Sequence, residues 1–459
     1  MPEPIARYSA IGDAAHATFA AVSMKDRASW SNWAGNQTCA PASIRRPTTE
    51  AELVGIVVDA ANAGRRVKCV GAGHSFTPIA CTDGVMVDLS RYGRLLGHDV
   101  ERRTVTVQAG MSLSTLCEEL DQRGLAMENM GDIAYQSIAG ATATATHGTG
   151  WHFGNISSRI VGLRLIAGDG SIVECSADQN PEILASARVG LGALGIVSTV
   201  TFEAVRAFRL HAIEEPIRVD EVLADFDGFM SSADHVEFYW VPHTGWALTK
   251  RNRRTDEPAV PRPKVRRLVD ELILPNVAFG ALCRIGRRRP SWIPRLAKIL
   301  PSTGRIEYTD RSDHVFTSPR LVHFYEMEYS IPRDAIPEAL NRVRRLVDEA
   351  GIQLSFPVEV RVVAPDDIPL STASGRASGY IAVHVYKGTP YDAYFQGVER
   401  IMDSYGGRPH WGKMHFQRAE SLAERYPRWD EFQAVRRRLD PEGRFTNQYL
   451  ERVLGPVAT

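Results

Sequence analysis

Hydrophobic residues in the first 200 positions switch between helical and strand spacing over short distances. Apolar residues recur every three or four positions from residue 53 to residue 61, which predicts a short amphipathic helix. Thr49 and Glu52 have the spacing of a capping box at its start, and Gly64 is placed to end it. Further helices are predicted to begin at Ser112 and Pro181, and strands are predicted at residues 67–70, 85–89, 104–108, 160–167, 171–175 and 196–202.

After about residue 203 the pattern changes, and a second region of mixed elements follows. Helical spacing predicts helices at residues 336–350 and 391–405. Strands are predicted at residues 235–241, 323–329, 358–363 and 380–386. Because short strands and helices are mixed without the regular alternation of a parallel sheet, the sequence predicts an α+β fold.

The bulk composition excludes several classes of protein. Hydrophobic residues make up 44% and charged residues 24% of the 459, which is typical of a globular protein. The 54 basic residues balance the 54 acidic ones, so charge gives no reason to expect a nucleic-acid partner. Six scattered cysteines without a C-x-x-C pair favour a reducing, cytoplasmic location. No secretory signal is predicted, and the apolar stretch 272–283 is too short to span a bilayer.

Charge is concentrated locally in the second half of the chain. Clusters of basic residues occur at 250–267 and 284–289. The second cluster, which Pro290 and Trp292 follow, is predicted to be a solvated loop, with peripheral membrane contact as the less favoured alternative.

Three glycine-rich segments are candidates for contact with a cofactor. Residues 71–76 directly follow a predicted strand, and small residues there can expose backbone N–H groups to a phosphate. His74 in that loop is either a nucleophile or tether, or a turn histidine bonded to local backbone. Residues 139–150 are small and hydroxyl-rich, so backbone there can approach a bulky group. Residues 190–195 match G-x-G-x-x-G in a reversed helix-to-strand context, which favours a plain turn over a Rossmann site.

Two polar motifs lie in the second half. Glu359 and Arg361 are two apart on a predicted strand, so their side chains share one face. They are either a surface ion pair on an edge strand or the polar floor of a site. Residues 410–413, His-Trp-Gly-Lys, follow a turn and form either a pocket wall or a solvated turn.

The histidine spacing does not predict a metal site. His147 and His152, like His410 and His415, are five apart, which is not metal-ligand spacing on a helix, and no metal is predicted.

Taken together in order, the motifs resemble those of a known family. They are WSNW (30–33), VGAGHSF (70–76), ACTDG (80–84), QSIAGA (136–141), TATHGTG (144–150), EVR (359–361), HWGK (410–413) and FTN (445–447). Their order from about residue 30 to residue 456 is similar to that in FAD flavoproteins of the vanillyl-alcohol-oxidase type. Within the aldonolactone oxidase and alditol oxidase branch, the motifs resemble those of actinobacterial L-gulono-1,4-lactone dehydrogenases.

The resemblance implies a two-lobed FAD-binding domain of the vanillyl-alcohol-oxidase (PCMH) type and an α+β cap domain over the substrate. The expected boundaries are a polar extension at 1–29, the FAD domain at 30–205, the cap at 206–425, and a segment at 426–459 that returns to the FAD domain. It also implies that FAD is bonded covalently to His74. The other residues expected near FAD are Gly71, Ala72, Gly73, Ser75, Phe76, Ser137, Gly140, Ala141, Thr144, Ala145, Thr146, His147, Ile196 and His410.

The implied reaction is oxidation of a sugar-derived aldonolactone at its C2 hydroxyl, with hydride transfer to flavin N5. Glu359 and Lys413 are expected to bind that hydroxyl and take its proton, with Arg361 near the flavin N1–C2 carbonyl edge. The substrate-side positions are Asp132 and Tyr386. Asp132 replaces the serine usual in alditol oxidases, which favours a lactone over a linear polyol.

Three alternatives remain at the level of sequence. The chain could be an alditol oxidase that forms hydrogen peroxide from xylitol or sorbitol. It could use a protein or quinone electron acceptor instead of O₂, although Gly131 leaves room beside the flavin for O₂. It could also be a non-enzymatic carbohydrate-binding protein on a flavin fold. Four retained residues argue against this: His74, Glu359, Arg361 and Lys413.

Overall fold

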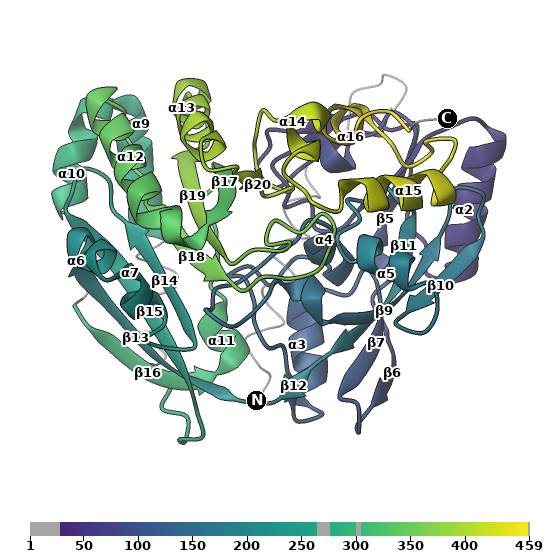
Figure 1. Cartoon of the computed structure of the whole chain (residues 1–459), viewed down its shortest axis with the longest axis horizontal. Coiled ribbons are helices and arrows are strands. Elements are labelled where there is room, and N and C mark those ends of the chain that lie inside the picture. Colours follow the sequence, from purple (N-terminus) through teal and green to yellow (C-terminus); the bar gives the residue numbers. More distant parts are fainter. Residues whose placement is uncertain (1–27, 264–275, 300–303, 458–459) are drawn as a thin grey trace, which may run out of the picture.

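The fold consists of two halves that meet along a central region (Figure 1). The computed structural model describes residues 28–263, 276–299 and 304–457. The first half holds a three-stranded parallel sheet of order β3-β5-β4 and a five-stranded antiparallel sheet of order β10-β9-β11-β7-β6. Their strands are β3 (Ser43–Arg45), β4 (Val67–Val70), β5 (Val85–Asp88), β6 (Leu95–Asp99), β7 (Thr104–Gln108), β9 (Ile160–Ile166), β10 (Ile172–Ser176) and β11 (Ile196–Glu203). Two-stranded pairs are β1 (Trp30–Ser31) with β2 (Thr38–Cys39), and β8 (Leu125–Ala126) with β12 (Val205–Arg206).

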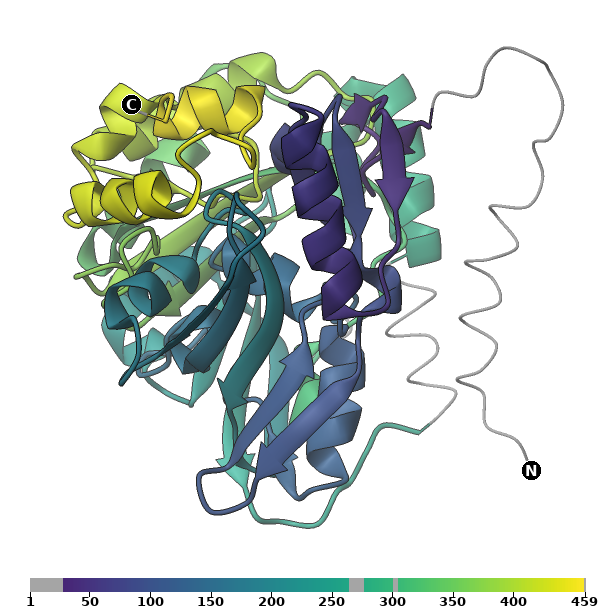
Figure 2. The same ribbon diagram turned by 90° about the vertical axis from the view of Figure 1, so that its right-hand side faces the viewer.

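Helix α2 (Glu50–Asn62) begins where the sequence predicts, and Figure 2 shows it in purple along the three-stranded sheet. Thr49 accepts a hydrogen bond from the Glu52 amide at 3.2 Å, as an N-cap should. The Glu52 carboxylate, however, bonds to the amide of Thr48 at 2.7 Å, one residue before the position that a capping box requires. Gly64 follows the helix with φ +61°, the left-handed conformation expected of a C-terminal glycine. The other helices of this half are α3 (Leu113–Asp121), α4 (Ile138–Ala143) and α5 (Pro181–Ala187).

The second half is built on an eight-stranded sheet of order β16-β13-β15-β14-β18-β19-β17-β20, in which every pair is antiparallel. One face is apolar and packs against α6, α7, α12 and α13, whereas the other face carries the charged side chains described below. The strands are β13 (Arg209–Arg218), β14 (His235–Trp240), β15 (Trp246–Thr255), β16 (Ile306–Arg311), β17 (Phe324–Pro332), β18 (Val358–Val363), β19 (Ser378–Tyr386) and β20 (Arg408–Pro409). The helices are α6 (Val219–Ala224), α7 (Phe226–Met230), α9 (Phe279–Arg288), α10 (Ile293–Ile299), α11 (Ser312–Phe316), α12 (Ile336–Glu349) and α13 (Asp392–Asp403).

The end of the chain returns to the first half (Figure 1). Helices α14 (Ala419–Ala423), α15 (Trp429–Leu439) and α16 (Gln448–Leu454) pack there, and α15 contacts α5. Trp411 and Leu422 already belong to the core of the first half, so the return begins before residue 426. The mixture of sheets and helices confirms the predicted α+β class.

One segment differs from the sequence-based prediction. The basic residues 284–289 were expected in a solvated loop, but most of them lie on helix α9. Small residues at Gly280, Cys283 and Gly286, three apart, form its buried side, and this stripe lacks the large apolar residues that normally identify a helix face. Residues 139–143 of the small, hydroxyl-rich segment belong to helix α4, although Gly140 and Thr142 are weak helix formers. Among the described residues, no helix combines the length and hydrophobicity needed to cross a membrane.

Candidate active site

Two cavities meet at Gln136, where the halves of the fold come together. The larger, of about 1330 Å³, is lined by residues 131–133, 136, 146 and 147 of the first half and by the charged face of the eight-stranded sheet. The smaller, of about 130 Å³, runs between the 71–75 loop, α4 and the 190–195 turn. The arrangement suits an elongated ligand whose one end is held by backbone and whose other end reaches a polar chamber.

The loop after β4 presents backbone to the smaller cavity. Among the described residues, the amides of Ala72 to Ser75 donate to no acceptor, so they remain available to a ligand such as a phosphate. A Cβ at Gly71 would clash with Ser137 Oγ, and one at Gly140 would lie 2.9 Å from the same oxygen. Glycine at both positions therefore lets the loop and α4 approach closely.

His74 lies in this loop against an aromatic stack. Its ring stacks on Trp33 with centroids 5.3 Å apart, and His323 stacks on Trp33 at 4.5 Å. Burial, followed by the positive charge of Lys413 and by His323, lowers the pKa of His74 to about 4. The imidazole is therefore neutral near pH 7, the form in which a ring nitrogen can act as a nucleophile.

The G-x-G-x-x-G segment is a helix-to-strand turn, as its reversed context predicted. It follows α5, and Gly192 and Gly195 adopt positive φ before β11 begins. The turn lines the smaller cavity, but the side chain of Ile196 points into the core beside Ile166 and Phe445. Ile196 was expected near the cofactor; it does not line the smaller cavity, whereas its neighbours Gly195 and Val197 do.

Strand register gathers the charged residues of the larger cavity. Tyr239 on β14 pairs with Glu359 on β18. Ala382 on β19 pairs with Glu359 on one side and with Glu328 of β17 on the other, so the three polar residues lie in one row across the sheet. Because alternate residues share a face, Glu359 and Arg361 project together, as predicted. Strand β18 is an interior strand and both side chains are buried, which excludes a surface ion pair on an edge strand.

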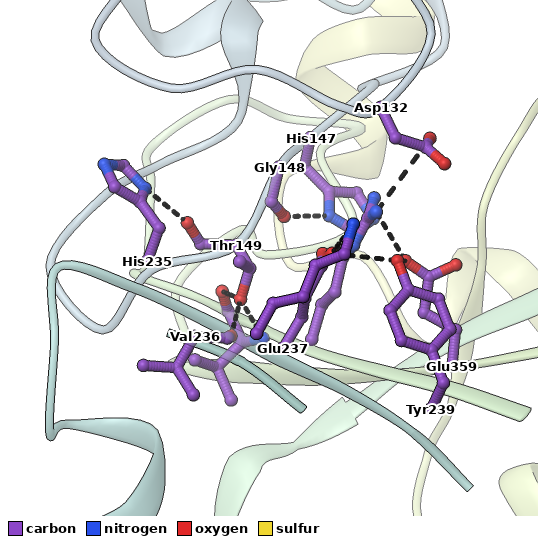
Figure 3. Close-up of polar contacts among 12 residues, drawn as sticks. Asp132, His147, Gly148, Thr149, His235, Val236, Glu237, Tyr239 and Glu359 are labelled. Carbon is purple, nitrogen blue, oxygen red and sulfur yellow. Dashed lines mark hydrogen bonds and ion pairs between the residues drawn. The ribbon is translucent and has the colours of Figure 1, made fainter. Parts of the chain in front are cut away.

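Glu359 shares its cationic partner with other carboxylates (Figure 3). Its Oε1 lies 2.5 Å from Arg361 Nη2, but Arg361 Nε also bonds to Glu237 at 2.8 Å, and Asp132 lies 3.9 Å from Nη2. Tyr239 donates to Glu237 at 2.8 Å and to Glu359 at 3.3 Å. Burial raises the pKa of Glu359 to about 7; Arg361 opposes the rise, while Asp132 and Glu237 add to it.

Each neighbouring carboxylate, by contrast, has a cationic or histidine partner of its own. These pairs are Asp132 with Arg320 at 2.5 Å, Glu237 with Lys250 at 3.4 Å, Glu326 with Lys413, and Glu328 with His147 at 3.5 Å. Burial works against ionisation of Asp132, yet Arg320 and Arg361 hold its pKa well below the usual range. Glu359 is thus the carboxyl group of this centre that titrates near neutral pH.

Lys413 lies in the cavity wall but does not bond to Glu359, with which it was expected to act. Its ammonium group pairs with Glu326, and its pKa is raised because Glu326 and Glu328 outweigh the effect of burial. The backbone explains this pairing: the Met414 amide donates to Glu326 O and the His410 amide to Glu328 O, so the 410–414 turn is fixed along β17. Glu326 and Glu328 gave no signal in the sequence beyond ordinary strand alternation.

His147, Glu328 and His410 form a buried cluster whose ligand atoms lie within 4.8 Å of one another, although sequence spacing gave no reason to connect them. His147 Nδ1 lies 2.8 Å from Gly148 O and His410 Nδ1 accepts from the Gly412 amide at 3.1 Å. A neutral His410 that accepts at Nδ1 carries its proton at Nε2, so that atom has no lone pair for a metal. The cluster therefore fits hydrogen bonding better than metal ligation.

The predicted residues separate into three groups. Gly71, Ala72, Gly73, His74, Ser75, Ser137, Gly140 and Thr144 line the smaller cavity. Asp132, Thr146, His147, Glu359, Arg361, His410 and Lys413 line the larger one. Phe76, Ala141, Ala145, Ile196 and Tyr386 line neither cavity.

Tyr386 was expected at the substrate, but the cavity-lining residue of its strand is His384. Tyr386 lies at the end of β19, packed in the cluster of Trp33, Phe324 and Cys283. His384, two residues earlier on the same face, lies 3.3 Å from Glu326. The strand was predicted correctly, whereas the residue that faces the cavity depends on where the strand crosses it.

Comparison with known proteins gives two family matches. Residues 41–176 match the FAD binding domain family, and residues 200–453 match the family described as D-arabinono-1,4-lactone oxidase. An L-gulono-1,4-lactone dehydrogenase of Mycobacterium tuberculosis is 49% identical over 430 residues, which cover 93% of this chain and 99% of that protein. An L-gulonolactone oxidase of Bos taurus is 34% identical (92% and 97% covered), and an alditol oxidase of a Streptomyces species is 32% identical (92% and 98%).

Among solved structures, the cholesterol oxidase of B. sterolicum has a similar fold. The two superpose with a TM-score of 0.79 over 93% of this chain and 96% of that one, at 19% sequence identity. This likeness confirms the expected two-lobed architecture with a second α+β half.

Proposed function

The chain belongs to the D-arabinono-1,4-lactone oxidase family of FAD-binding oxidoreductases, and from this premise we propose that it oxidises an aldonolactone of the L-gulono-1,4-lactone or D-arabinono-1,4-lactone type at the C2 hydroxyl. The observation that carries the proposal is Glu359, a buried carboxyl group with a pKa of about 7 in the wall of the larger cavity. A general base acts best when its pKa lies near the working pH.

The residues at both cavities fit FAD. The amides of Ala72 to Ser75 suit a pyrophosphate, and the glycines at 71 and 140 leave room for backbone to approach it. Thr146 Oγ1, at the junction with the larger cavity, is buried without a hydrogen-bond partner among the described residues, as expected of a group that meets a polar ring edge. Bound FAD supplies the hydride acceptor and passes the electrons on to O₂ or another acceptor.

The chain's own residues bind the substrate and move its proton. Glu359 accepts the proton of the C2 hydroxyl, and Lys413, held by Glu326 in the same cavity, donates a hydrogen bond that orients this hydroxyl. Arg361 places a fixed positive charge beside the reacting groups. Asp132 is held by Arg320 at the edge of the cavity, where the pair contacts the lactone ring and disfavours an extended polyol.

The domain roles follow from this assignment. Residues 30–205 and the returning C-terminal segment, which begins before residue 426, hold FAD, and the eight-stranded sheet of the second half supplies the substrate wall. A panel of aldonolactones, xylitol and sorbitol tests the substrate class. Turnover on polyols but not on lactones would replace the proposal by an alditol oxidase. Comparing rates in air with rates under an artificial acceptor separates an oxidase from a dehydrogenase.

We expect kcat/KM for the lactone to rise with pH through an apparent pKa near 7. Below that pKa Glu359 is protonated and cannot accept a proton, and above it the carboxylate is available. Initial rates measured from about pH 5.5 to about pH 9 give the profile. A rate that falls with pH across this range would contradict the role of Glu359 as base.

Replacing Gly71 by alanine is expected to lower the FAD content. The new Cβ would meet Ser137 Oγ and push the 71–75 loop away from α4, an overpacking of about 1–3 kcal/mol that weakens binding by about tenfold or more. The flavin-to-protein absorbance ratio measures the effect. Gly97→Ala is the matched control, because no atom lies within 4 Å of the position its Cβ would take. Equal FAD content in both variants would argue against this loop as the phosphate site.

A further inference from the structure

Helices α9 and α10 form an unusually basic wall on a protein whose acidic and basic residues balance overall. Between Asn276 and Ile299 the sequence has six basic residues and no acidic one, although basic and acidic residues are equal in number over the whole chain. All six are exposed, and no carboxylate of the described residues forms an ion pair with them. They are Arg284, Arg287, Arg288, Arg289, Arg295 and Lys298.

The two sides of α9 have opposite character. Its inner side is made of small residues, so neighbouring side chains pack closely against the helix backbone. A Cβ at Gly280 would lie 3.3 Å from Val322, and one at Gly286 would lie 2.8 Å from Ile293. Its outer side carries Ala281, Arg284, Ile285 and Arg288, which are exposed and have i, i+3, i+4, i+7 spacing. Arg284 and Arg288 therefore form an outward stripe together with Ile285.

Large apolar side chains are exposed among these cations. Val277 is 61% exposed, Ile285 42% and Trp292 50%. Leu321, 60% exposed, is joined to this surface through its amide, which donates to Asn276 Oδ1 at 2.7 Å. Exposed apolar and aromatic side chains interleaved with arginines are typical of helices that lie in the interface of a membrane with anionic lipids.

We propose that the outer face of α9 and α10 is a docking surface for an anionic phospholipid bilayer. The arginines contact lipid phosphates and carboxylates, while Trp292 and Ile285 enter the headgroup region. The inner faces of the same helices line the larger cavity through Phe279, Leu282 and Leu296. Both helices lie at the edge of the second half (Figure 1). Docking would therefore bring the wall that they form, in the same cavity as Glu359, against the bilayer.

The test is flotation of the full-length holoenzyme with vesicles of phosphatidylcholine, with and without phosphatidylglycerol. The wild type is expected to float with the anionic vesicles only, and to be released by added salt because exposed charges are screened. The triple variant R284E/R288E/R295E is expected to lose affinity by about 100-fold, from about 1 kcal/mol for each basic residue removed. Because these residues do not line the cavity, its turnover with a soluble acceptor is expected to match the wild type.

The matched control is R91E/R102E/R437E, which also reverses three exposed arginines, two near β6 and one on α15 in the other half. It is expected to bind vesicles like the wild type. The proposal is overturned if the wild type ignores anionic vesicles, if it binds neutral ones equally well, or if the triple variant still floats. Binding of an acidic protein without binding of vesicles would also overturn it. Since flotation needs no substrate, failure here leaves the proposed reaction untouched.

Discussion

Replacing Glu359 by glutamine is expected to leave FAD bound and to lower kcat for the lactone by at least about 10²-fold. The amide keeps the size of the side chain but cannot take a proton from the C2 hydroxyl. Stopped-flow measurement of flavin bleaching by the lactone without O₂ isolates this step from reoxidation. The apparent pKa near 7 in the pH profile should disappear with the carboxyl group.

A second buried carboxyl group provides the control for this variant. Glu399 accepts a hydrogen bond from Tyr329 at 2.5 Å and one from the Phe416 amide at 2.8 Å, away from both cavities, and burial also raises its pKa. Glu399→Gln should therefore retain turnover and the pH profile even if it loses some stability. Near-normal turnover of Glu359→Gln would remove Glu359 from the mechanism, whatever the control shows.

Replacing His74 by alanine is expected to release all of the flavin from acid-precipitated protein. We propose a covalent bond between the His74 imidazole and FAD, so the yellow colour of the wild type should stay with the pellet. Without the ring nitrogen, FAD binds reversibly and the colour should move to the supernatant. Because a covalent link raises the flavin potential, the variant should also turn over more slowly.

His323→Ala is the control for His74, because both rings stack on Trp33 from within the same cluster. Loss of His323 should leave the colour in the pellet. Colour in the supernatant of the wild type would show that FAD is not tethered, although the fold and the proton-accepting role of Glu359 could stand. Colour in the pellet of His74→Ala would place the tether on another residue.

Local sequence signals were reliable where neighbouring residues decide the structure. The spacing around Thr49 and Gly64 predicted the start and end of α2, and alternation predicted β18 with the shared face of Glu359 and Arg361. The reversed context of residues 190–195 favoured a helix-to-strand turn, which is what the structure shows between α5 and β11. In each case hydrogen bonds or side-chain faces within a few residues determine the outcome.

Sequence patterns did not predict contacts between side chains on strands that are far apart in the chain. Glu237, Tyr239, Glu326 and Arg320 belong to the charged centre, yet each looks like an ordinary polar residue of a strand or loop. Register across four strands, which the chain alone does not reveal, brings them together. The same reason explains why Lys413 pairs with Glu326, and why His384 rather than Tyr386 faces the cavity.

The sequence by itself determined the α+β class, the glycine loop with His74, the pair Glu359 and Arg361, and, through its ordered motifs, the family. The tertiary structure alone decided how the carboxyl groups of the centre are partnered. Burial raises the free energy of every ionised group there, and Arg361 is shared between Glu237 and Glu359. That competition exists only after the sheet has formed, and it leaves Glu359 with a pKa of about 7 while its neighbours are held as ions.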